Sequence, residues 1–163
     1  MLEIIAVLCL IGALIVLALL SAIDLKHGIL PNKLVLCLAV LGSVFHAASG
    51  FAYFPPVEMA MGSVVGGGLL YVIREGAIRF YGEDALGLGD VKLLAAGGIW
   101  LGVEYVLIAI TLGALAGFLH GLGLAVYRAV KTKTRPDLHR LSLPAGPGFA
   151  VGLIAAAMIM FWP

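Results

Sequence analysis

The sequence predicts an all-α polytopic membrane protein, and its composition, its uncharged stretches and its charge positions support this prediction. Hydrophobic residues make up 63% of the 163 residues, charged residues only 12%, and the mean hydropathy is +1.15. Soluble domains carry about 25% charged residues, so the composition excludes an ordinary soluble globule. The net charge of +1 provides no basic field for nucleic acid.

Uncharged stretches predict about six transmembrane helices, because a bilayer core requires about 20 apolar residues per helix. Pro55 and Pro56 end the second helix, and Arg74 and Arg79 can snorkel at the end of the third. The fourth stretch would reach only about 18 Å at 1.5 Å per residue. It is a short span, a re-entrant segment or part of the next helix, so five spans is the rival count. The expected spans are 4–23, 34–52, 59–80, 91–102, 105–127 and 141–163.

The basic residues predict the orientation of these spans. All ten Lys and Arg lie in three places: after the first span, around the junction between the third and fourth spans, and after the fifth span. The remaining connections carry Glu58 and Glu104, and Glu3 lies near the N-terminus. The positive-inside rule therefore places the basic connections in the cytoplasm and both termini outside.

Few residues inside the predicted spans bear chemistry. His46 and His120 are the titratable mid-span candidates, and we expect them to be packed or hydrogen-bonded rather than part of a proton relay. Cys9 and Cys37 lie in apolar runs and are expected in the core. Two cysteines cannot form a four-thiolate zinc site. Glycines at four-residue spacing predict close helix packing at 62 and 66 and at 113, 117 and 121.

Two acids stand where predicted spans meet the cytoplasmic face. Asp24 closes the first span, and Asp90 follows Gly87-Leu88-Gly89 and opens the fourth. They would meet if these spans pack together. Alternatively, Asp90 is an ordinary N-cap, and Asp24 is a solvated loop acid near Lys26. A solvated acid at position 24 would be unusual, because the C-terminal end of a helix disfavours an anion.

Paired carboxyls would suit hydrolysis of an amide. Two carboxyls a few ångströms apart cannot both ionise easily, so they share a proton. One then takes a proton from water while the other polarises the carbonyl and protonates the leaving nitrogen. The helix ends suggest that Asp24 starts protonated and that Asp90 starts as the base. Gly87 and Gly89 would allow positive φ and close approach of a substrate backbone. Lys92 would stabilise the Asp90 carboxylate or serve as a snorkelling anchor.

Three segments of the chain carry a resemblance to a known family. The first contains Ile23-Asp24 with Ile29-Leu30-Pro31-Asn32, the second is Gly87-Leu88-Gly89-Asp90-Val91-Lys92, and the third is Pro144-Ala145-Gly146-Pro147. Together they resemble the type IV prepilin peptidases, which are aspartic membrane proteases with a Gly-X-Gly-Asp signature. The second segment resembles the part of the family that carries its second aspartate, and the third is similar to its Pro-X-Gly-Pro motif before the last span. The resemblance extends over essentially the whole chain and implies a single transmembrane peptidase domain, 1–163.

The resemblance also implies a function. Asp24 and Asp90 would form the catalytic pair of an endopeptidase in the inner membrane, with its active site facing the cytoplasm and membrane lipid around it. The resemblance implies no metal and no cofactor. The substrate would be the N-terminus of a prepilin or pseudopilin, cleaved after a glycine that ends a short basic leader. Glu83 and Asp84 could attract that leader, and the sequence agrees equally well with the alternative that they are ordinary solvated acids.

Larger members of that family carry an N-terminal region with four cysteines and also N-methylate the new terminus. Only Cys9 and Cys37 occur here, so the chain resembles the short, peptidase-only form. Related proteases of preflagellins or other substrates share the signature. The sequence is also compatible with a transporter or with a non-catalytic pilus or secretion assembly subunit, although the uncharged span interiors disfavour the transporter. The oligomeric state is not predicted.

Overall fold

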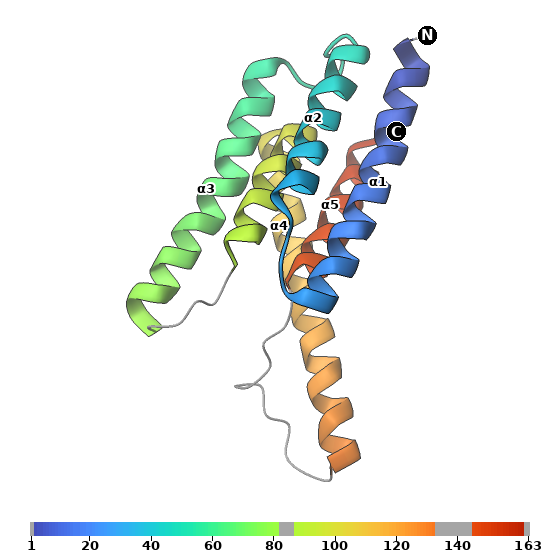
Figure 1. Ribbon diagram of the computed structural model, residues 1–163. Coiled ribbons are helices and arrows are strands. Elements are labelled where there is room, and N and C mark those ends of the chain that lie inside the picture. Colours follow the sequence, from blue (N-terminus) through green and yellow to red (C-terminus); the bar gives the residue numbers. More distant parts are fainter. Residues whose placement is uncertain (1, 82–86, 133–144, 162–163) are drawn as a thin grey trace.

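The computed structural model describes residues 2–81, 87–132 and 145–161, and all its regular elements are helices (Figure 1). They are α1 (Leu2–His27), α2 (Asn32–Ala48), α3 (Pro56–Tyr81), α4 (Leu88–Thr132) and α5 (Gly146–Phe161). No strand occurs in the described ranges. The prediction of an all-α protein is confirmed.

Three of the helices are long and apolar enough to cross a membrane. They are Leu2–His27, Pro56–Phe80 and Leu88–Tyr127, while α2 and α5 are shorter apolar helices. Large apolar side chains such as Leu8 and Val64, 60% and 72% exposed, point away from the bundle, as expected for a surface in contact with lipid. These features support a membrane protein, and the count of six spans stays a prediction.

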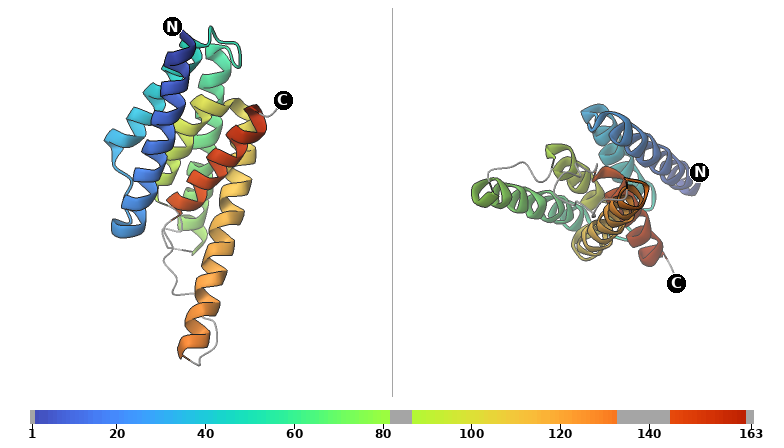
Figure 2. Two further views of the ribbon diagram at one scale, coloured as in Figure 1. Left: turned by 90° about the vertical axis from the view of Figure 1, so that its right-hand side faces the viewer. Right: turned by 90° about the horizontal axis from the view of Figure 1, so that it is seen from below.

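The longest helix, α4, is broken at Gly102. This residue has φ 64° and ψ −171°, which no helix contains. The first half of α4 rises toward the end that holds the N-terminus, and the second half runs back in the opposite direction (Figures 1 and 2). The short segment predicted at 91–102 therefore does not continue straight into the next helix. It is a helix of residues 88–101, which makes α4 a helical hairpin.

One buried and one partly buried polar contact hold this break. A helix end leaves carbonyl and amide groups without partners, and these groups need other partners in an apolar surrounding. The His46 ring Nε2 lies 3.1 Å from the Trp100 carbonyl oxygen, and the Glu58 Oε1 accepts a hydrogen bond of 3.1 Å from the Val103 amide. His46 is fully buried, which confirms its expected packing, whereas His120 is exposed.

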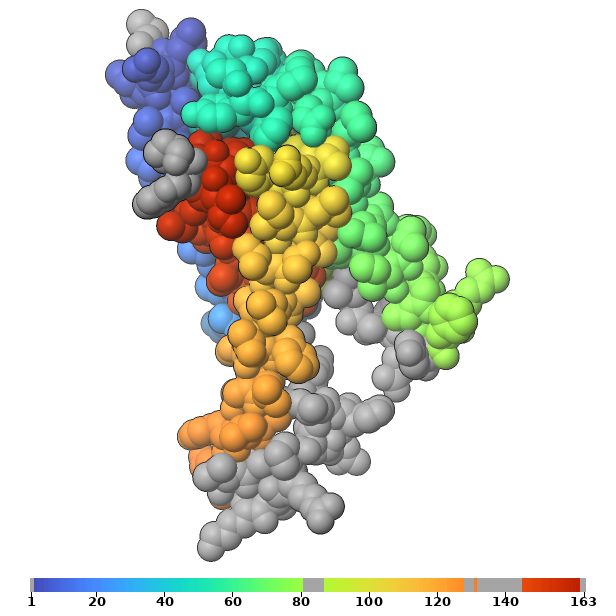
Figure 3. Space-filling view, turned by 180° about the vertical axis from the view of Figure 1, so that it is seen from behind, coloured from blue at the N-terminus to red at the C-terminus, as the bar shows by residue number. Residues whose placement is uncertain are grey.

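The predicted glycine packing is present at several positions. A Cβ at Gly62 would collide with the backbone of Gly98, and one at Gly113 would lie 2.7 Å from Phe149 Cδ1. Gly117, by contrast, has open space at that position. Close packing thus joins α3 to α4 and α4 to α5, as small residues allow in lipid. Figure 3 shows α5 in red between α1 in blue and α4 in yellow.

Cys9 is buried in the core, as expected, but Cys37 is exposed. The prediction for Cys37 was wrong because it lies on the outer side of α2. The helix buries Val35, Leu38, Gly42, Phe45 and His46, a stripe at helical spacing that excludes position 37. In a membrane protein the outer surface is apolar too, so hydrophobicity alone does not separate it from the core.

The chain path brings the two predicted acids to one end of the bundle. The start of α1 and the end of α5 lie toward the upper end in Figure 1, and the end of α1 and the starts of α2, α4 and α5 lie toward the lower end. The ends of the helices thus lie at the same ends of the bundle as the predicted path of the chain places them. Which end faces the cytoplasm stays a prediction from the basic residues.

Candidate active site

Asp24 extends the buried stripe of α1 by one turn. The buried residues of this helix recur at helical spacing and end at Asp24: Cys9, Ala13, Val16, Leu17, Leu20, Asp24. The Asp24 side chain is 6% exposed, and its Oδ2 accepts a hydrogen bond of 2.9 Å from the Gly146 amide at the start of α5. Asp24 is therefore not a solvated loop acid. The glycine that ends α1, Gly28, adopts φ +65° and turns the chain toward α2.

Asp90 is the third residue of α4 and is likewise 6% exposed. Its carboxyl is hydrogen-bonded by the Gly87 backbone. The Asp90 carboxyl thus binds a backbone group at the start of α4, as a capping residue does, although Asp90 is not the N-cap residue itself. Its Oδ1 is buried and has no hydrogen-bond partner in the part of the chain that the structure describes. A buried oxygen without a partner costs free energy, so it is available to bind water, a proton or a substrate atom.

Both carboxyls line one pocket of about 260 Å³ at the lower end of the bundle. They lie close enough for the charge of Asp24 to act on Asp90. The pocket opens between the end of α1, the α1–α2 connection and the start of α4, and its lining residues are Asp24, Gly28, Ile29, Leu30, Asn32, Gly87, Leu88, Gly89, Asp90 and Lys92. The pocket thus brings together the first two segments of the resemblance, with Asp24 and Asn32 from the first and Asp90 from the second.

The glycines of the Gly-X-Gly-Asp segment serve close packing. Neither Gly87 nor Gly89 is among the described glycines with positive φ, so that part of the prediction was wrong. A Cβ at Gly89 would lie 2.9 Å from the Leu30 Cβ, and one at Gly87 would lie 3.2 Å from the Asp90 Oδ2. At Gly89 the physical reason for glycine is therefore the contact between the start of α4 and Leu30 of the α1–α2 connection, and at Gly87 it is the approach of the Asp90 carboxyl.

Lys92 contacts Asn32 across the mouth of this pocket. Its Nζ donates a hydrogen bond of 3.0 Å to the Asn32 Oδ1, and both residues line the pocket. The bond joins the start of α2 to the start of α4. Lys92 is exposed, so this polar pair can contact a molecule that enters the pocket.

Sequence reasoning did not include Gly146 among the site residues. Its amide contacts Asp24, and a Cβ at this position would lie 2.6 Å from the Asp24 Oδ2. The available signal was the Pro144-Ala145-Gly146-Pro147 segment, which supported the resemblance but was given no role.

The acids near residue 83 are less informative. Glu83 and Asp84, which the sequence suggested as substrate-binding residues, lie outside the described residues. Glu75 forms an ion pair of 3.0 Å with Arg74 on α3 and does not line the pocket. In the described ranges, no group of three or more His, Cys, Asp or Glu side chains could hold a metal ion.

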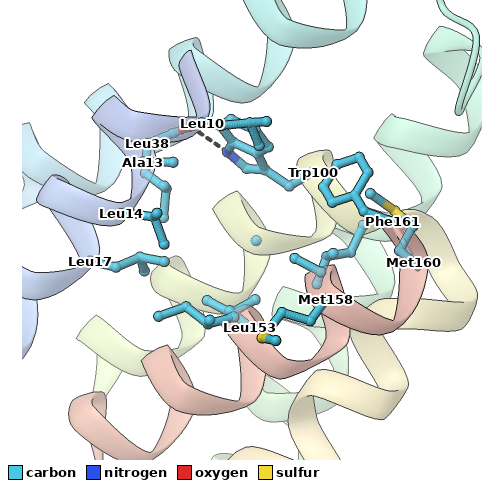
Figure 4. Close-up of a pocket in the computed structure, with 14 residues that line it drawn as sticks. Leu10, Ala13, Leu14, Leu17, Leu38, Trp100, Leu153, Met158, Met160 and Phe161 are labelled. Carbon is cyan, nitrogen blue, oxygen red and sulfur yellow. Dashed lines mark hydrogen bonds between the residues drawn. The ribbon is translucent and has the colours of Figure 1, made fainter. Parts of the chain in front are cut away.

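A second, larger pocket of about 390 Å³ is almost entirely apolar. It lies between α1, α2, α4 and α5, where the Trp100 indole donates a hydrogen bond of 2.9 Å to the Leu38 carbonyl (Figure 4). Its lining includes no acid, base or nucleophile among the described residues. The smaller pocket is therefore the one that carries reactive groups.

A helical, apolar chain that buries two carboxyls beside one pocket has the features of a membrane enzyme with acid–base chemistry. Comparison with known proteins identifies the family. Residues 10–122 match the model of the type IV leader peptidase family, and the chain belongs to this family.

Relatives with curated names agree with this assignment. The chain is similar to the "Prepilin leader peptidase/N-methyltransferase" of Xanthomonas campestris pv. campestris, with 32% identity over 87% of this chain and 45% of that protein. For the protein of the same name from Aeromonas salmonicida, the identity is 33% over 90% of this chain and 46% of the relative. The protein of the same name from Escherichia coli K12 is 37% identical over 60% of this chain and 43% of the relative. The chain thus spans about half the length of these relatives. No solved structure matches it.

Proposed function

We propose that this protein is an aspartic endopeptidase that removes the leader peptide from type IV prepilins or pseudopilins. Membership of the type IV leader peptidase family supports the substrate class. The observation that carries the proposal is the pocket shared by Asp24 and Asp90, two buried carboxyls from distant parts of the matched region. A structural role alone would not require two acids to be buried side by side.

The proposed reaction needs only the two carboxyls and water. Buried together, the carboxyls hold one proton between them, because two adjacent negative charges are unfavourable in an apolar surrounding. The ionised carboxyl takes a proton from water, and the water oxygen attacks the carbonyl carbon of the scissile bond. The protonated carboxyl donates to the carbonyl oxygen. The unpartnered Asp90 Oδ1 and the polar Lys92–Asn32 pair are the groups available to bind the substrate backbone.

The proposed membrane location of the active site follows from the end of the bundle at which the pocket lies. The basic connections favour a cytoplasmic position for the pocket, in a multi-pass protein of the inner membrane. A substrate with a basic leader and a following apolar segment could then place its cleavage site at the membrane surface. Its leader would remain in water and its apolar segment in lipid.

The proposal is tested by co-expressing the protein with a prepilin and following leader removal by mass spectrometry. Asp24→Asn and Asp90→Asn should each lower the cleavage rate by about a hundredfold or more, the contribution typical of a positioned acid or base. Glu104→Gln removes an exposed acid far from the pocket and should cleave normally. Complete processing by either aspartate variant would favour a non-catalytic assembly subunit. Cleavage of a preflagellin but not of a prepilin would change the substrate assignment.

A further inference from the structure

The Asp24 carboxyl is held by the first turn of a helix that belongs to a distant part of the sequence. The Gly146 amide donates to the Asp24 Oδ2 at 2.9 Å in a buried position. A hydrogen bond to a charged carboxylate is stronger than one to a neutral group, and it favours the ionised form. The contact is close: a Cβ at Gly146 would lie 2.6 Å from the same oxygen. Only glycine permits this approach.

The first turn of α5 offers few other amides for this purpose. Ala145 precedes the helix, and its carbonyl accepts the hydrogen bond of 3.1 Å from the Phe149 amide. The first amides of a helix have no partner inside it, and proline has no amide hydrogen. Because Pro147 follows Gly146, the Gly146 amide is one of few free donors at this helix end. The positive end of the α5 dipole adds to its effect on the carboxylate.

The environment of Asp90 is different. Its Oδ1 is buried and has no partner in the described ranges, so part of this carboxyl lacks the donors that a buried carboxylate needs. A proton on this oxygen would avoid that cost and could be given to a substrate carbonyl. Among the residues that the structure describes, the charged groups that line the pocket are Asp24, Asp90 and Lys92, and the Lys92 hydrogen bond goes to Asn32.

We infer that the N-terminus of α5 decides the roles of the two carboxyls: Gly146 is a positioning residue that holds Asp24 as the carboxylate, so that Asp90 carries the shared proton. This inference rests on the proposed function and reverses the order expected from the ends of α1 and α4 alone. That expectation considered each aspartate with its own helix and omitted the N-terminus of α5.

The roles define each proton transfer. Asp24 takes a proton from water as the water oxygen bonds to the scissile carbonyl carbon, and Asp90 donates its proton to the carbonyl oxygen. The carbon–nitrogen bond then breaks, and the leaving nitrogen receives the proton held by Asp24. The hydroxyl of the intermediate returns a proton to Asp90 as the new carboxyl group forms. One water is consumed, and both aspartates regain their starting states.

The decisive variant is Gly146→Ala, with Gly117→Ala as its matched control. Both replace a glycine by alanine, but a Cβ at Gly117 meets nothing within 4 Å. Gly146→Ala should displace Asp24, lower kcat by about tenfold to a hundredfold with KM little changed, and leave a folded protein. The acid limb of the pH–rate profile should move upward by about one pH unit, because the carboxylate loses its donor. Gly117→Ala should match the wild type in both measurements.

A titration that needs no substrate separates this inference from the proposed function. In protein with ¹³C-labelled aspartate, NMR resonances assigned with Asp24→Asn and Asp90→Asn should show Asp24 ionising at lower pH than Asp90. The reverse order, or an unchanged pH–rate profile in a folded Gly146→Ala variant, would overturn the assigned roles while the peptidase function stood. Absence of prepilin cleavage by the wild type would overturn the function and leave the titration result intact.

Discussion

Replacing Gly102 by alanine tests whether the break in α4 is built into the backbone. Gly102 has φ 64° and ψ −171°, a region that is essentially restricted to glycine. Its surroundings add to the constraint, because a Cβ there would lie 3.1 Å from Phe54 Cε1 and 3.2 Å from Glu58 Cγ. Glu58 itself caps the second half of α4 through the Val103 amide. The substitution therefore perturbs both the backbone and one of the contacts that hold the hairpin.

The expected loss can be estimated from these two effects. A side chain in such a backbone region costs about 1–3 kcal/mol. For a chain of 150–250 residues, 1 kcal/mol corresponds to a change in Tm of about 2–4 °C. Gly102→Ala should therefore lower the Tm by about 2–12 °C. Crowding against Phe54 and Glu58 moves the result toward the larger value.

The assay is thermal unfolding of the purified protein in detergent, followed by circular dichroism. Gly123→Ala is the control, because Gly123 lies in the same helix with ordinary helical backbone and with no atom within 4 Å of a Cβ. An ordinary glycine-to-alanine change in a helix stabilises by about 0.5–1 kcal/mol, so the control should change Tm little or raise it. Equal Tm values for the two variants would refute the argument. Because the first half of α4 carries Asp90, Gly102→Ala should also slow cleavage more than Gly123→Ala does.

The remaining predictions concern the buried histidine and the polar residues near the pocket. His46→Leu removes the partner of the carbonyl at the α4 break and should cost about 1–3 kcal/mol in thermal unfolding; an unchanged Tm would show that this contact contributes nothing. Lys92→Met and Asn32→Ala remove the same hydrogen bond, so the double variant should cleave no more slowly than the slower single variant, whereas additive losses in kcat/KM would indicate separate roles. Charge reversal at Glu83 and Asp84 should raise KM for a prepilin with kcat little changed if these acids bind the basic leader; an unchanged KM would remove them from the site.

Much of the fold could be predicted because helices in lipid must satisfy their own backbone hydrogen bonds. Apolar stretches of sufficient length therefore identify most of the helices, and the ends predicted for the first three lie close to the observed ones. The hairpin in α4 was less accessible. Residues 88–132 are apolar almost throughout, and many glycines in the chain adopt ordinary helical angles. The sequence placed a break between 102 and 105 but left open whether the chain reverses there, because no local pattern fixes the backbone angles of Gly102.

In the candidate active site, too, some features could be predicted from the sequence and others could not. Asp24 and Asp90 were recognisable because acids are rare in so apolar a chain, and their helix ends could be assigned from hydropathy. The contact between Gly146 and Asp24 joins residues separated by 122 positions, and no local pattern predicts it. It exists because α1 and α5 pack side by side at that end of the bundle.

The amino-acid sequence by itself determined that the chain forms apolar helices, that its basic residues gather in alternate connections, and that two acids stand at helix ends. These properties depend on each residue and its near neighbours. Only the tertiary structure decided that α4 reverses at Gly102, that Lys92 contacts Asn32, and that an amide of α5 reaches Asp24. Each of these depends on how closely two helix backbones can approach, and that distance is set by the packing of the whole bundle.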